Sequence, residues 1–271
     1  MNDKMTVLVV SCDKYQDIVE QYLRYLRLNW SDCSFPIAVA TEECTISDKN
    51  VRTIKCGKDV QWTKEVLMAL DQIKSEYVLL TVDDLFISKK VDNNALEEAL
   101  LFMCEHNIDY YRIPKFQVKN SKKSLYSGTT HVARIQKDKV YSITIGSSIW
   151  RKTKLKKILG DGTKTAWELE DRFIELALKS KRGYYNKYVT DTRPLLHCAH
   201  MVTGGRWIRK GVNDMRKQGY EIDTSKREFL SLGQEMRMKV YGTATKFVPK
   251  SFRRPLKSFL NRFGMQFATK N

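Results

Sequence analysis

The stretch SEYVLLTVDDLFIS, residues 75–88, decides the fold class. Its apolar run at 77–80 predicts a strand that is buried on both faces. Two adjacent carboxylates, Asp83 and Asp84, follow this run, and the chain then turns apolar again at 85–87. Like charges repel unless a cation or a hydrogen-bond donor lies between them. The pair therefore needs a physical reason for its place at the end of a core strand.

Strand and helix patterns alternate along the chain before this point. Residues 6–10 and 36–41 predict buried strands, and 51–56 predicts an alternating one. Apolar residues at helical spacing predict one helix ending near Trp30 and another at about 63–73. Such alternation indicates βαβ units. The sequence thus predicts an α/β fold with a Rossmann-like, mostly parallel central sheet flanked by helices.

Beyond Asp84 the pattern is less regular. It predicts, in order, a helix at 93–105, a polar and basic loop or hairpin at 115–138, a strand at 139–150, a basic helix up to 159 and a helix after the loop Gly160-Asp161-Gly162. Residues 184–189 and the segment LLHCAHMVTGGRW come next without an assigned element, and a polar helical stretch is predicted up to about 241. In the helix after the glycine-containing loop, Phe173, Leu176 and Ala177 are expected to face inward.

Composition bounds the class of protein. With 271 residues, 42% of them hydrophobic, the chain can bury a sizeable core. A net charge of +17 favours an anionic partner, whether nucleic acid, anionic lipid or a phosphorylated substrate. The six cysteines form no CxxC pair, and we expect reduced thiols in a cytosolic protein. The N-terminus is too short and polar for a signal peptide, and no apolar stretch approaches the roughly 20 residues that span a bilayer.

A divalent cation bound between the two adjacent aspartates would offset the repulsion between their charges. In open α/β sheets ligands bind beyond the carboxyl ends of the strands, where Asp83 and Asp84 are expected to lie. Mg²⁺ or Mn²⁺ takes carboxylate oxygens and shares the rest of its coordination shell with phosphate. The pair therefore predicts a metal–diphosphate site. The alternative is a pair of solvated acids at the start of a loop, or Asp84 capping a turn.

The stretch LLTVDDLFI resembles the DXD-type metal motif of glycosyltransferases with the A-type (GT-A) nucleotide-sugar fold. The chain is similar, over roughly residues 6–210, to glycosyltransferases of bacterial polysaccharide synthesis, such as that of capsule or O-antigen. The resembling segments, in this order, are VVSCDKYQDIVEQYLRYLRLNW, DCSFPIAVAT, GKDVQWTKEVLMAL, YVLLTVDDLFI, SSIWRKTKLKKIL, AWELED and HMVTGGRW. One residue separates the two acids in the family's strict motif, whereas here they are adjacent. The resemblance implies a GT-A-like fold, Mn²⁺ or Mg²⁺, a nucleotide-diphosphate sugar donor and a hydroxyl acceptor.

Donor-binding residues can be read in that light. Ser11, Cys12 and Asp13 end the first strand, where a nucleoside can rest on the sheet edge, and Asp83 joins them. Asp13 is expected to accept from a base or ribose hydroxyl, or else to form a turn or cap the following helix. Asp59 is expected to reach the base or ribose. Trp62 either stacks on the base or belongs to the core.

The motif AWELED is a second acidic focus, at a helix start. Acids there suit the helix macrodipole, which is the alternative to a catalytic role. Inverting sugar transfer needs a base that deprotonates the acceptor hydroxyl. The resemblance maps this base onto Glu170-Asp171 or Glu168, with Asp171 as the first choice and Glu168 as the second.

A late histidine and a basic stretch complete the predicted site. The resemblance implies that His197 or His200 completes the metal shell or touches the diphosphate, and His200 is assigned to the metal; the alternative is a structural role. Arg206, with Arg209 and Lys210, is expected to neutralise the departing phosphates. The preceding Gly-Gly suits a loop that closes over the donor.

The last 26 residues differ from the rest. From Lys246 onward the chain has seven basic residues and no acidic one, and phenylalanines and leucines share one helical face. We expect residues 1–245 to form the glycosyltransferase domain and 246–271 a basic, helical, amphipathic extension on an anionic membrane surface. The alternative is a terminal helix packed on the domain. The expected location is cytoplasmic, on the inner face of the cell membrane, where a polyprenyl-diphosphate-linked glycan acceptor would be found.

Two other classes of function remain open. The net charge of +17 fits a nucleic-acid-binding protein, but no RNP, KH or zinc signature is present, so nucleic acid is not an expected partner. A nucleotidyltransferase could use a similar α/β sheet, but no glycine-rich phosphate loop with a lysine follows the first strand.

Overall fold

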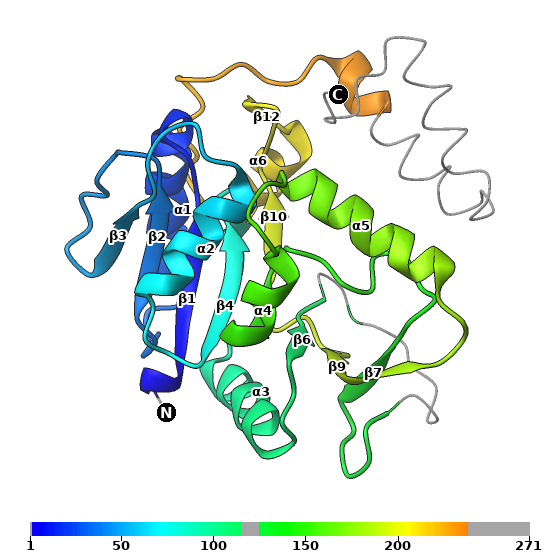
Figure 1. Cartoon of the computed structure of the whole chain (residues 1–271). Coiled ribbons are helices and arrows are strands. Elements are labelled where there is room, and N and C mark those ends of the chain that lie inside the picture. Colours follow the sequence, from blue (N-terminus) through cyan, green and yellow to red (C-terminus); the bar gives the residue numbers. More distant parts are fainter. Residues whose placement is uncertain (1, 115–116, 118–124, 238–271) are drawn as a thin grey trace. The chain divides into compact units, whose positions relative to one another are not determined.

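The structure, a computed structural model, describes residues 2–114, 117 and 125–237 (Figure 1). The chain divides into two compact units, Met1–Ala199 and His200–Asn271. Each is described by itself. The division at 245 proposed above stays a prediction, and the basic extension lies outside the described residues. Within those residues no helix has both the length and the apolar character needed to cross a membrane.

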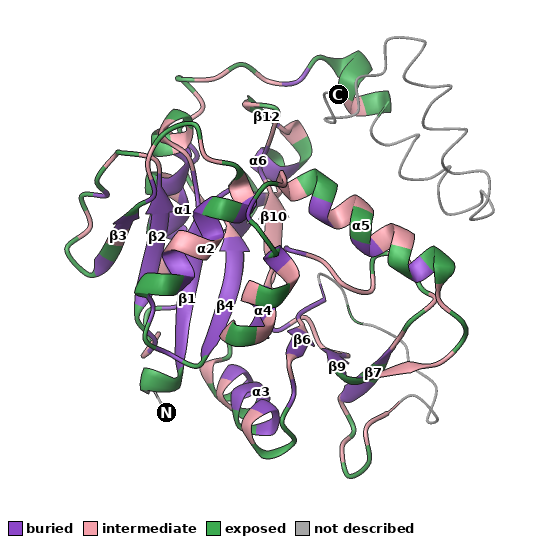
Figure 2. Cartoon of the chain, in the orientation of Figure 1, coloured by how far each residue is buried: buried purple, intermediate pink, exposed green. Residues whose placement is uncertain are grey.

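The first half of the first unit is a parallel sheet. Its elements are β1 (Met5–Val10), α1 (Gln16–Asn29), β2 (Ile37–Thr41), β3 (Val51–Lys55), α2 (Trp62–Gln72) and β4 (Tyr77–Val82), with short 3₁₀ turns η1 (Asn2–Lys4) and η2 (Asp13–Tyr15). The four strands pair in parallel in the order β3-β2-β1-β4. All residues of β1 and β2 are buried, as are all but the last of β4 (Figure 2). The continuous apolar runs of the sequence thus form the centre of the sheet.

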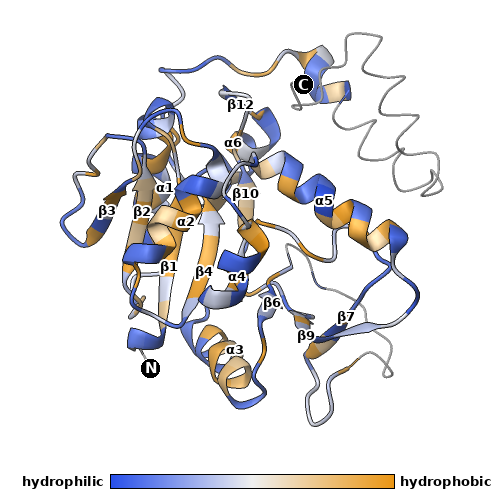
Figure 3. Ribbon diagram, in the orientation of Figure 1, coloured by the Kyte–Doolittle hydropathy of each residue, from blue (hydrophilic) through white to orange (hydrophobic). Residues whose placement is uncertain are grey.

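Helices cover both faces of this sheet. The apolar residues of α2 (Val66, Leu70) pack on the face that β1 presents through Leu8 and Val10. On the other face α1 lies behind the strands in Figure 1, and its Tyr22 and Tyr25 rings contact Phe86. The hydropathy colours of Figure 3 show the same arrangement, with apolar strands between helices that are polar on their outer sides. The predicted Rossmann-like α/β fold class is confirmed.

The second half of the sheet is mixed. The order continues from β4 as β8 (Ser148–Arg151), β6 (Tyr110–Arg112), β9 (Tyr184–Asp191) and β7 (Val132–Gln136). Pairing is antiparallel at β4–β8, β8–β6 and β9–β7, and parallel at β6–β9. Two helices, α4 (Lys152–Leu159) and α5 (Ala166–Lys179), add Leu155, Leu159, Leu169 and Phe173 to the same apolar cluster as α2.

Several predictions for this half are wrong in detail. In the range 115–138 the hairpin alternative fits the described residues, since Leu125 forms an antiparallel bridge with Ala133 at the start of β7. The strand expected from 139, by contrast, begins only at 148. The strand β6 was missed, because three residues are too few to show a period. Leu176 of α5 is 48% exposed, so only Phe173 and Ala177 of the predicted trio face the core.

The remaining elements of the first unit are short except for one helix. The strand β5 (Leu85–Ile87) pairs with β10 (Cys198–His200), of which Cys198 and Ala199 belong to this unit, and α3 (Asn93–Glu105) occupies the predicted range. Asp92 caps α3 by accepting from the backbone N–H of Ala95 at 3.1 Å.

The second unit, taken by itself, is small in its described part. It holds the hairpin of β11 (Val202–Thr203) and β12 (Arg206–Trp207), and the helix α6 (Arg209–Arg216). Of the polar helical stretch predicted up to about 241, the described residues form a helix only at α6 and at 232–237. Gly219 lies shortly after the end of α6. Its φ of +86° is a backbone conformation that glycine adopts without strain.

Candidate active site

Ser11 and Asp83 meet at the carboxyl edge of the parallel sheet. Val10 lies opposite Val82 in the β1–β4 register, so the next residue of each strand is also a neighbour. The Ser11 hydroxyl donates to Oδ2 of Asp83 at 2.5 Å, and both residues are about 95% buried. One oxygen of Asp83 is therefore held by the protein itself. This confirms that the opening motif and the end of the first strand lie together.

Asp84 is the second residue of the two-residue turn between β4 and β5, and it is half-buried. In the described part of the chain no three His, Cys, Asp or Glu side chains are grouped so as to hold a metal ion. Mg²⁺ and Mn²⁺ do not need such a group, since one or two carboxylates plus substrate phosphates suffice. The Asp83–Asp84 pair thus fits a cation that arrives with a diphosphate. It does not form a closed metal cage.

Asp13 is engaged with the loop after β2. Its carboxylate accepts from the backbone N–H groups of Glu43 and Cys44 at 3.0–3.1 Å, and its own N–H donates to Glu42. Burial opposes ionisation of Asp13, but these donors together lower the pKa of its carboxyl. Asp13 therefore shapes the wall of the edge, as the turn-forming alternative proposed. Its contact with a donor stays a prediction.

A cluster of acids surrounds Cys12. Burial, and then the charges of Asp83, Glu42 and Glu65, raise the pKa of the Cys12 thiol to about 11. Cys12 is therefore a neutral thiol at pH 7. Neither Glu42 nor Glu65 was expected from the sequence.

Glu65 left a signal that was overlooked. It lies one and two turns before Ala69 and Ile73 on the buried side of α2. A charged residue in register with an apolar face is the pattern that should have singled it out.

Asp59 and Trp62 lie between β3 and α2. Asp59 is exposed and adopts φ +59°, a conformation that aspartate tolerates better than most residues. Trp62 is the first residue of α2, is half-buried and packs against the apolar cluster under the helix. The core alternative for Trp62 therefore accounts for one side of its ring and leaves part of it accessible.

The start of α5 is fixed by a capping box. The Thr165 hydroxyl accepts from the backbone N–H of Glu168, and Glu168 Oε2 accepts from the Thr165 backbone at 2.7 Å. These bonds from Thr165 lower the pKa of the Glu168 carboxyl. Glu168 thus has a structural role at the helix end. Its catalytic role is untested, and because of this structural role Glu168 is the least suitable base of the three acids.

Glu170 is brought to the same edge as Asp83. Its carboxylate accepts from the backbone N–H of Ile145, and burial raises its pKa. Because β8 runs antiparallel to β4 with Ser148 opposite Leu80, residues before Ser148 continue past the end of β4 where Asp83 lies. Consistent with this, a Cβ on Gly146 would lie 3.9 Å from the side chain of Leu85. Asp171, the first choice from the sequence, is half-buried beside Glu170.

The loop before α5 is tied to the start of α2. The Thr63 backbone N–H and hydroxyl both donate to the Lys164 carbonyl, at 3.0 and 2.7 Å, and the Lys164 N–H donates back to the hydroxyl at 2.8 Å. Gly162, at φ +78°, passes so close to Lys64 that a Cβ would lie 3.0 Å from its Cα. The helix that carries Glu65 and the helix that carries Glu170 therefore begin from one joint.

The predicted residues near 200 have mixed surroundings. The carbonyl of His197 accepts from Ser88 N–H and Oγ, while burial and then the charge of Lys89 lower the pKa of its ring. His200 and Arg206 belong to the second unit, where Arg206 is exposed and lies 3.9 Å from Glu228. Their assignments to the metal and to the donor diphosphate stay predictions.

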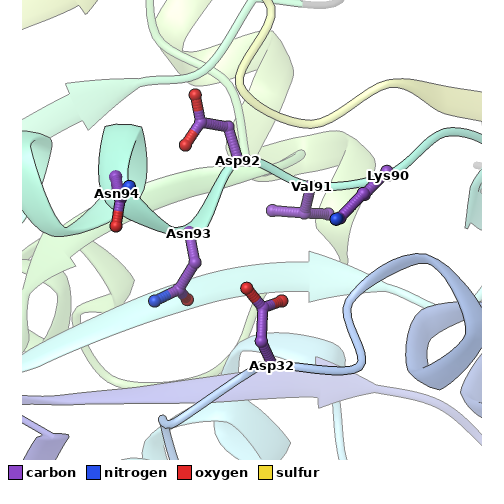
Figure 4. Close-up of a pocket in the computed structure, with 6 residues that line it drawn as sticks. All are labelled: Asp32, Lys90, Val91, Asp92, Asn93 and Asn94. Carbon is purple, nitrogen blue, oxygen red and sulfur yellow. The ribbon is translucent and has the colours of Figure 1, made fainter.

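Two open cavities of the first unit lie elsewhere. One, of about 350 Å³, is lined by the residues of Figure 4: Asp32, Lys90, Val91, Asp92, Asn93 and Asn94. It lies where α1 ends and α3 begins, and α1 runs from the carboxyl edge of the sheet to the opposite edge. A second, of about 620 Å³, is lined by tyrosines of β9, among them Tyr184 and Tyr185, near the amino end of that strand. Neither includes Asp83 or Glu170.

No protein-family model matches the chain. No curated protein matches it either. Solved structures do overlap with it at low identity. TarS 1–349 of S. aureus in complex with UDP is 18% identical, with 69% of this chain and 60% of that one covered and a TM-score of 0.41. The mannosyltransferase PcManGT from Pyrobaculum calidifontis, with GDP-Man and Mn²⁺, is 10% identical, covering 70% and 56%, with a TM-score of 0.41.

A cytidylyltransferase from Leptospira borgpetersenii is 13% identical, covering 64% of this chain and 74% of that one, with a TM-score of 0.39. The chain spans between 35% and 60% of the length of the TarS chains that it matches. At these TM-scores the backbones diverge over much of their length. The acidic edge of the sheet itself, built from Ser11, Asp83, Asp84 and Glu170, is thus the feature from which a function can be derived.

Proposed function

We propose that the chain is a glycosyltransferase that moves a sugar from a nucleotide-diphosphate sugar to a hydroxyl group. One observation carries the proposal. The acids that follow β4 and the acid of α5 held by Ile145 come from distant parts of the sequence and reach one edge of the sheet. Carboxyl ends of parallel strands are where α/β proteins bind nucleotides.

The donor would occupy the side built by β1 and β4. Ser11 and Asp83 form a fixed, buried pair there, and Asp84 is placed beside them on the turn. A divalent cation bound by Asp84 and Asp83 together with the donor diphosphate would neutralise charge on the leaving group. The chain's own part is to hold the diphosphate and nucleoside against the strand ends, so that the anomeric carbon faces α5.

The acceptor hydroxyl would lie on the side of α5. Glu170 is the acid best placed to take its proton, because burial raises the pKa of its carboxyl and the Ile145 N–H fixes its orientation. As the proton moves to Glu170, the acceptor oxygen forms a bond to the anomeric carbon. The bond from that carbon to the diphosphate oxygen breaks, and the nucleoside diphosphate leaves. A single carboxylate base corresponds to inversion at the anomeric carbon.

The finer assignments follow the sequence resemblance. They are a hexose donor, Mn²⁺ or Mg²⁺, a polyprenyl-diphosphate-linked glycan acceptor, a role in bacterial surface polysaccharide synthesis, and a cytoplasmic protein held on the inner face of the membrane by residues 246–271. Asp171 stays an alternative to Glu170 as the base. His200 and Arg206 are retained as ligands of the metal and the leaving diphosphate.

A thermal-shift screen tests the proposal. UDP-, GDP-, CMP- and dTDP-sugars are each added to the full chain with and without Mn²⁺. We expect one nucleotide class to raise the melting temperature, and the metal to enlarge the shift, because a ligand that binds only the folded state stabilises it. Slow release of free sugar from that donor should follow. No shift with any donor, with or without metal, would refute the proposed function.

A further inference from the structure

Glu65 is a buried acid without a hydrogen-bond partner for one of its oxygens. It lies on the first turns of α2, is 7% exposed, and its Oε1 has no partner within the described part of the chain. A buried carboxylate normally accepts several hydrogen bonds, because the loss of its hydration is otherwise uncompensated. In the protein alone, then, Glu65 lacks a donor that its position demands.

Its neighbours increase the demand. Burial first, and then the charges of Glu42, Asp83 and Asp13, act against ionisation of Glu65, and no cation is among these influences. The other acids have donors of their own. Asp13 accepts from the 43–44 backbone, Glu42 from Asp13 N–H, and Asp83 from the Ser11 hydroxyl. Within the described residues no donor reaches Oε1, so a molecule bound at this edge of the sheet is free to supply one.

Trp62 indicates what kind of molecule this is. It precedes Glu65 by three residues on α2, so the two side chains lie on adjoining parts of one helix face. Part of the indole remains accessible. A flat aromatic surface with a hydrogen-bond acceptor one turn away suits a planar heterocycle that carries an N–H group. A ribose offers hydroxyl donors but no flat face.

We propose that Glu65 reads the base of the donor nucleotide, by accepting a hydrogen bond from a nucleobase N–H while Trp62 contacts the ring. The inference rests on the proposed function and names its specificity-determining residue. Sites of this kind reject ligands that lack the matching donor, because the acceptor is then left buried and unpaired. They also make the free protein less stable than its packing alone allows.

The test compares Glu65→Leu and Glu65→Gln with wild type, and uses Glu97→Gln as the control. Glu97 is a half-buried helical acid, but unlike that of Glu65 its carboxylate accepts from Asn93 at 2.9 Å. Melting temperatures and dissociation constants are measured with UDP, GDP, CDP, dTDP and ADP in Mn²⁺, with Mn²⁺-pyrophosphate, and with the N-methylated form of the base that binds best.

We expect Glu65→Leu to melt higher than wild type without ligand and to bind the preferred nucleotide at least tenfold more weakly. Glu65→Gln should retain more of the affinity, since its amide oxygen still accepts. Pyrophosphate binding should not change, and the N-methylated base should bind wild type as poorly as the normal base binds Glu65→Leu. A purely structural role would instead lower the unliganded melting temperature.

The outcomes separate the two proposals. If wild type binds a nucleotide and both Glu65 variants bind it with unchanged affinity and base preference, the inference about Glu65 is overturned and the proposed function survives. If wild type binds none of the five nucleotides, both are overturned. Loss of base preference in Glu65→Leu with intact pyrophosphate binding supports both.

Discussion

The two halves of the central sheet differ in construction and in what they contribute. The parallel half, β3-β2-β1-β4, has three strands that are buried along nearly their whole length, β2, β1 and β4, and it holds Ser11, Asp83 and Asp84 at its carboxyl edge. The mixed half, β8-β6-β9-β7, has mostly short strands, and it supplies Glu170 through Ile145 and α5. The junction of β4 and β8 is where the halves meet. The difference suggests a division of labour, with donor binding on one half and acceptor activation on the other.

The largest effect should come from the parallel half. Asp84→Asn removes the charge beside the diphosphate without changing the size of the side chain. We expect kcat/KM for sugar transfer to fall about a thousandfold, or ~4 kcal/mol, together with loss of the metal-dependent thermal shift. Asp83→Asn should be similar and should also lower stability, because Ser11 loses its charged acceptor. Wild-type rates in both variants would remove the metal–diphosphate role.

The acids of α5 test the mixed half. Glu170→Gln should lower kcat by about a hundredfold or more while the dissociation constant of the donor stays nearly unchanged. Asp171→Asn is the competing variant, and the one with the larger kcat loss identifies the base. Glu168→Gln is the control, and it should change only stability, by about 1 kcal/mol, through the capping box. If a Glu170 variant weakens donor binding instead, the assignment of donor binding to one half and acceptor activation to the other is wrong.

Glu65 gives the stability of the parallel half a pH dependence. Burial, and then Glu42, Asp83 and Asp13, raise the pKa of Glu65 to about 8 from an ordinary 4.5. The folded state therefore holds a proton that the unfolded state releases between these values, so stability falls as the pH rises through this window. Below pH 4.5 the effect vanishes, and above pH 8 it is complete.

Urea unfolding at pH 5 to 9 measures this term. The difference between Glu65→Gln and wild type should grow by about 3 kcal/mol from pH 5 to 8 and then level off. Taking the difference cancels the titration of groups that both proteins share and that do not interact with Glu65, such as Cys33. A difference that is flat across the window would place Glu65 in water.

The joint between the halves should give the smallest effect. Gly162→Ala and Gly160→Ala both force a positive φ on alanine, at +78° and +70°, and each should cost about 1 kcal/mol. Only at Gly162 does the new Cβ press on the Lys64 backbone, since nothing lies within 4 Å at Gly160. We expect roughly 1 kcal/mol more destabilisation and a lower kcat for Gly162→Ala. Equal behaviour of the two variants would show that the joint does not couple α2 to α5.

The same contrast explains what the sequence could and could not predict. In the parallel half, long runs such as 6–10 and 77–80 have one reading, and the ends of those strands necessarily share an edge. The meeting of Ser11 with Asp83 was therefore predictable. In the mixed half, β6 has three residues and β8 four, too few for a period, and their pairing partners lie far away in the chain.

Site residues divide along a different line. Acids next to strand ends were found from their position. Glu65 lies within a helix, and only its spacing from the apolar residues of the buried side indicates that it is buried. Conversely, the first two choices for the base were drawn from a motif, and the position of an acid in that motif does not show how deeply its side chain is buried. Thr165 and Glu168 satisfy the capping pattern S/T-x-x-E, so that part of the assignment was legible in the sequence.

The shared bonds of Thr63 and Lys164 have a consequence for timing. A molecule bound against the first turn of α2 would change the position or mobility of Thr63. Three hydrogen bonds between Thr63 and Lys164 would pass that change to the 162–165 segment. The helix carrying Glu170 starts from this segment. In the proposed reaction, a donor bound against α2 would thereby fix the starting point of the helix that carries the base, which would favour binding of the donor before the acceptor.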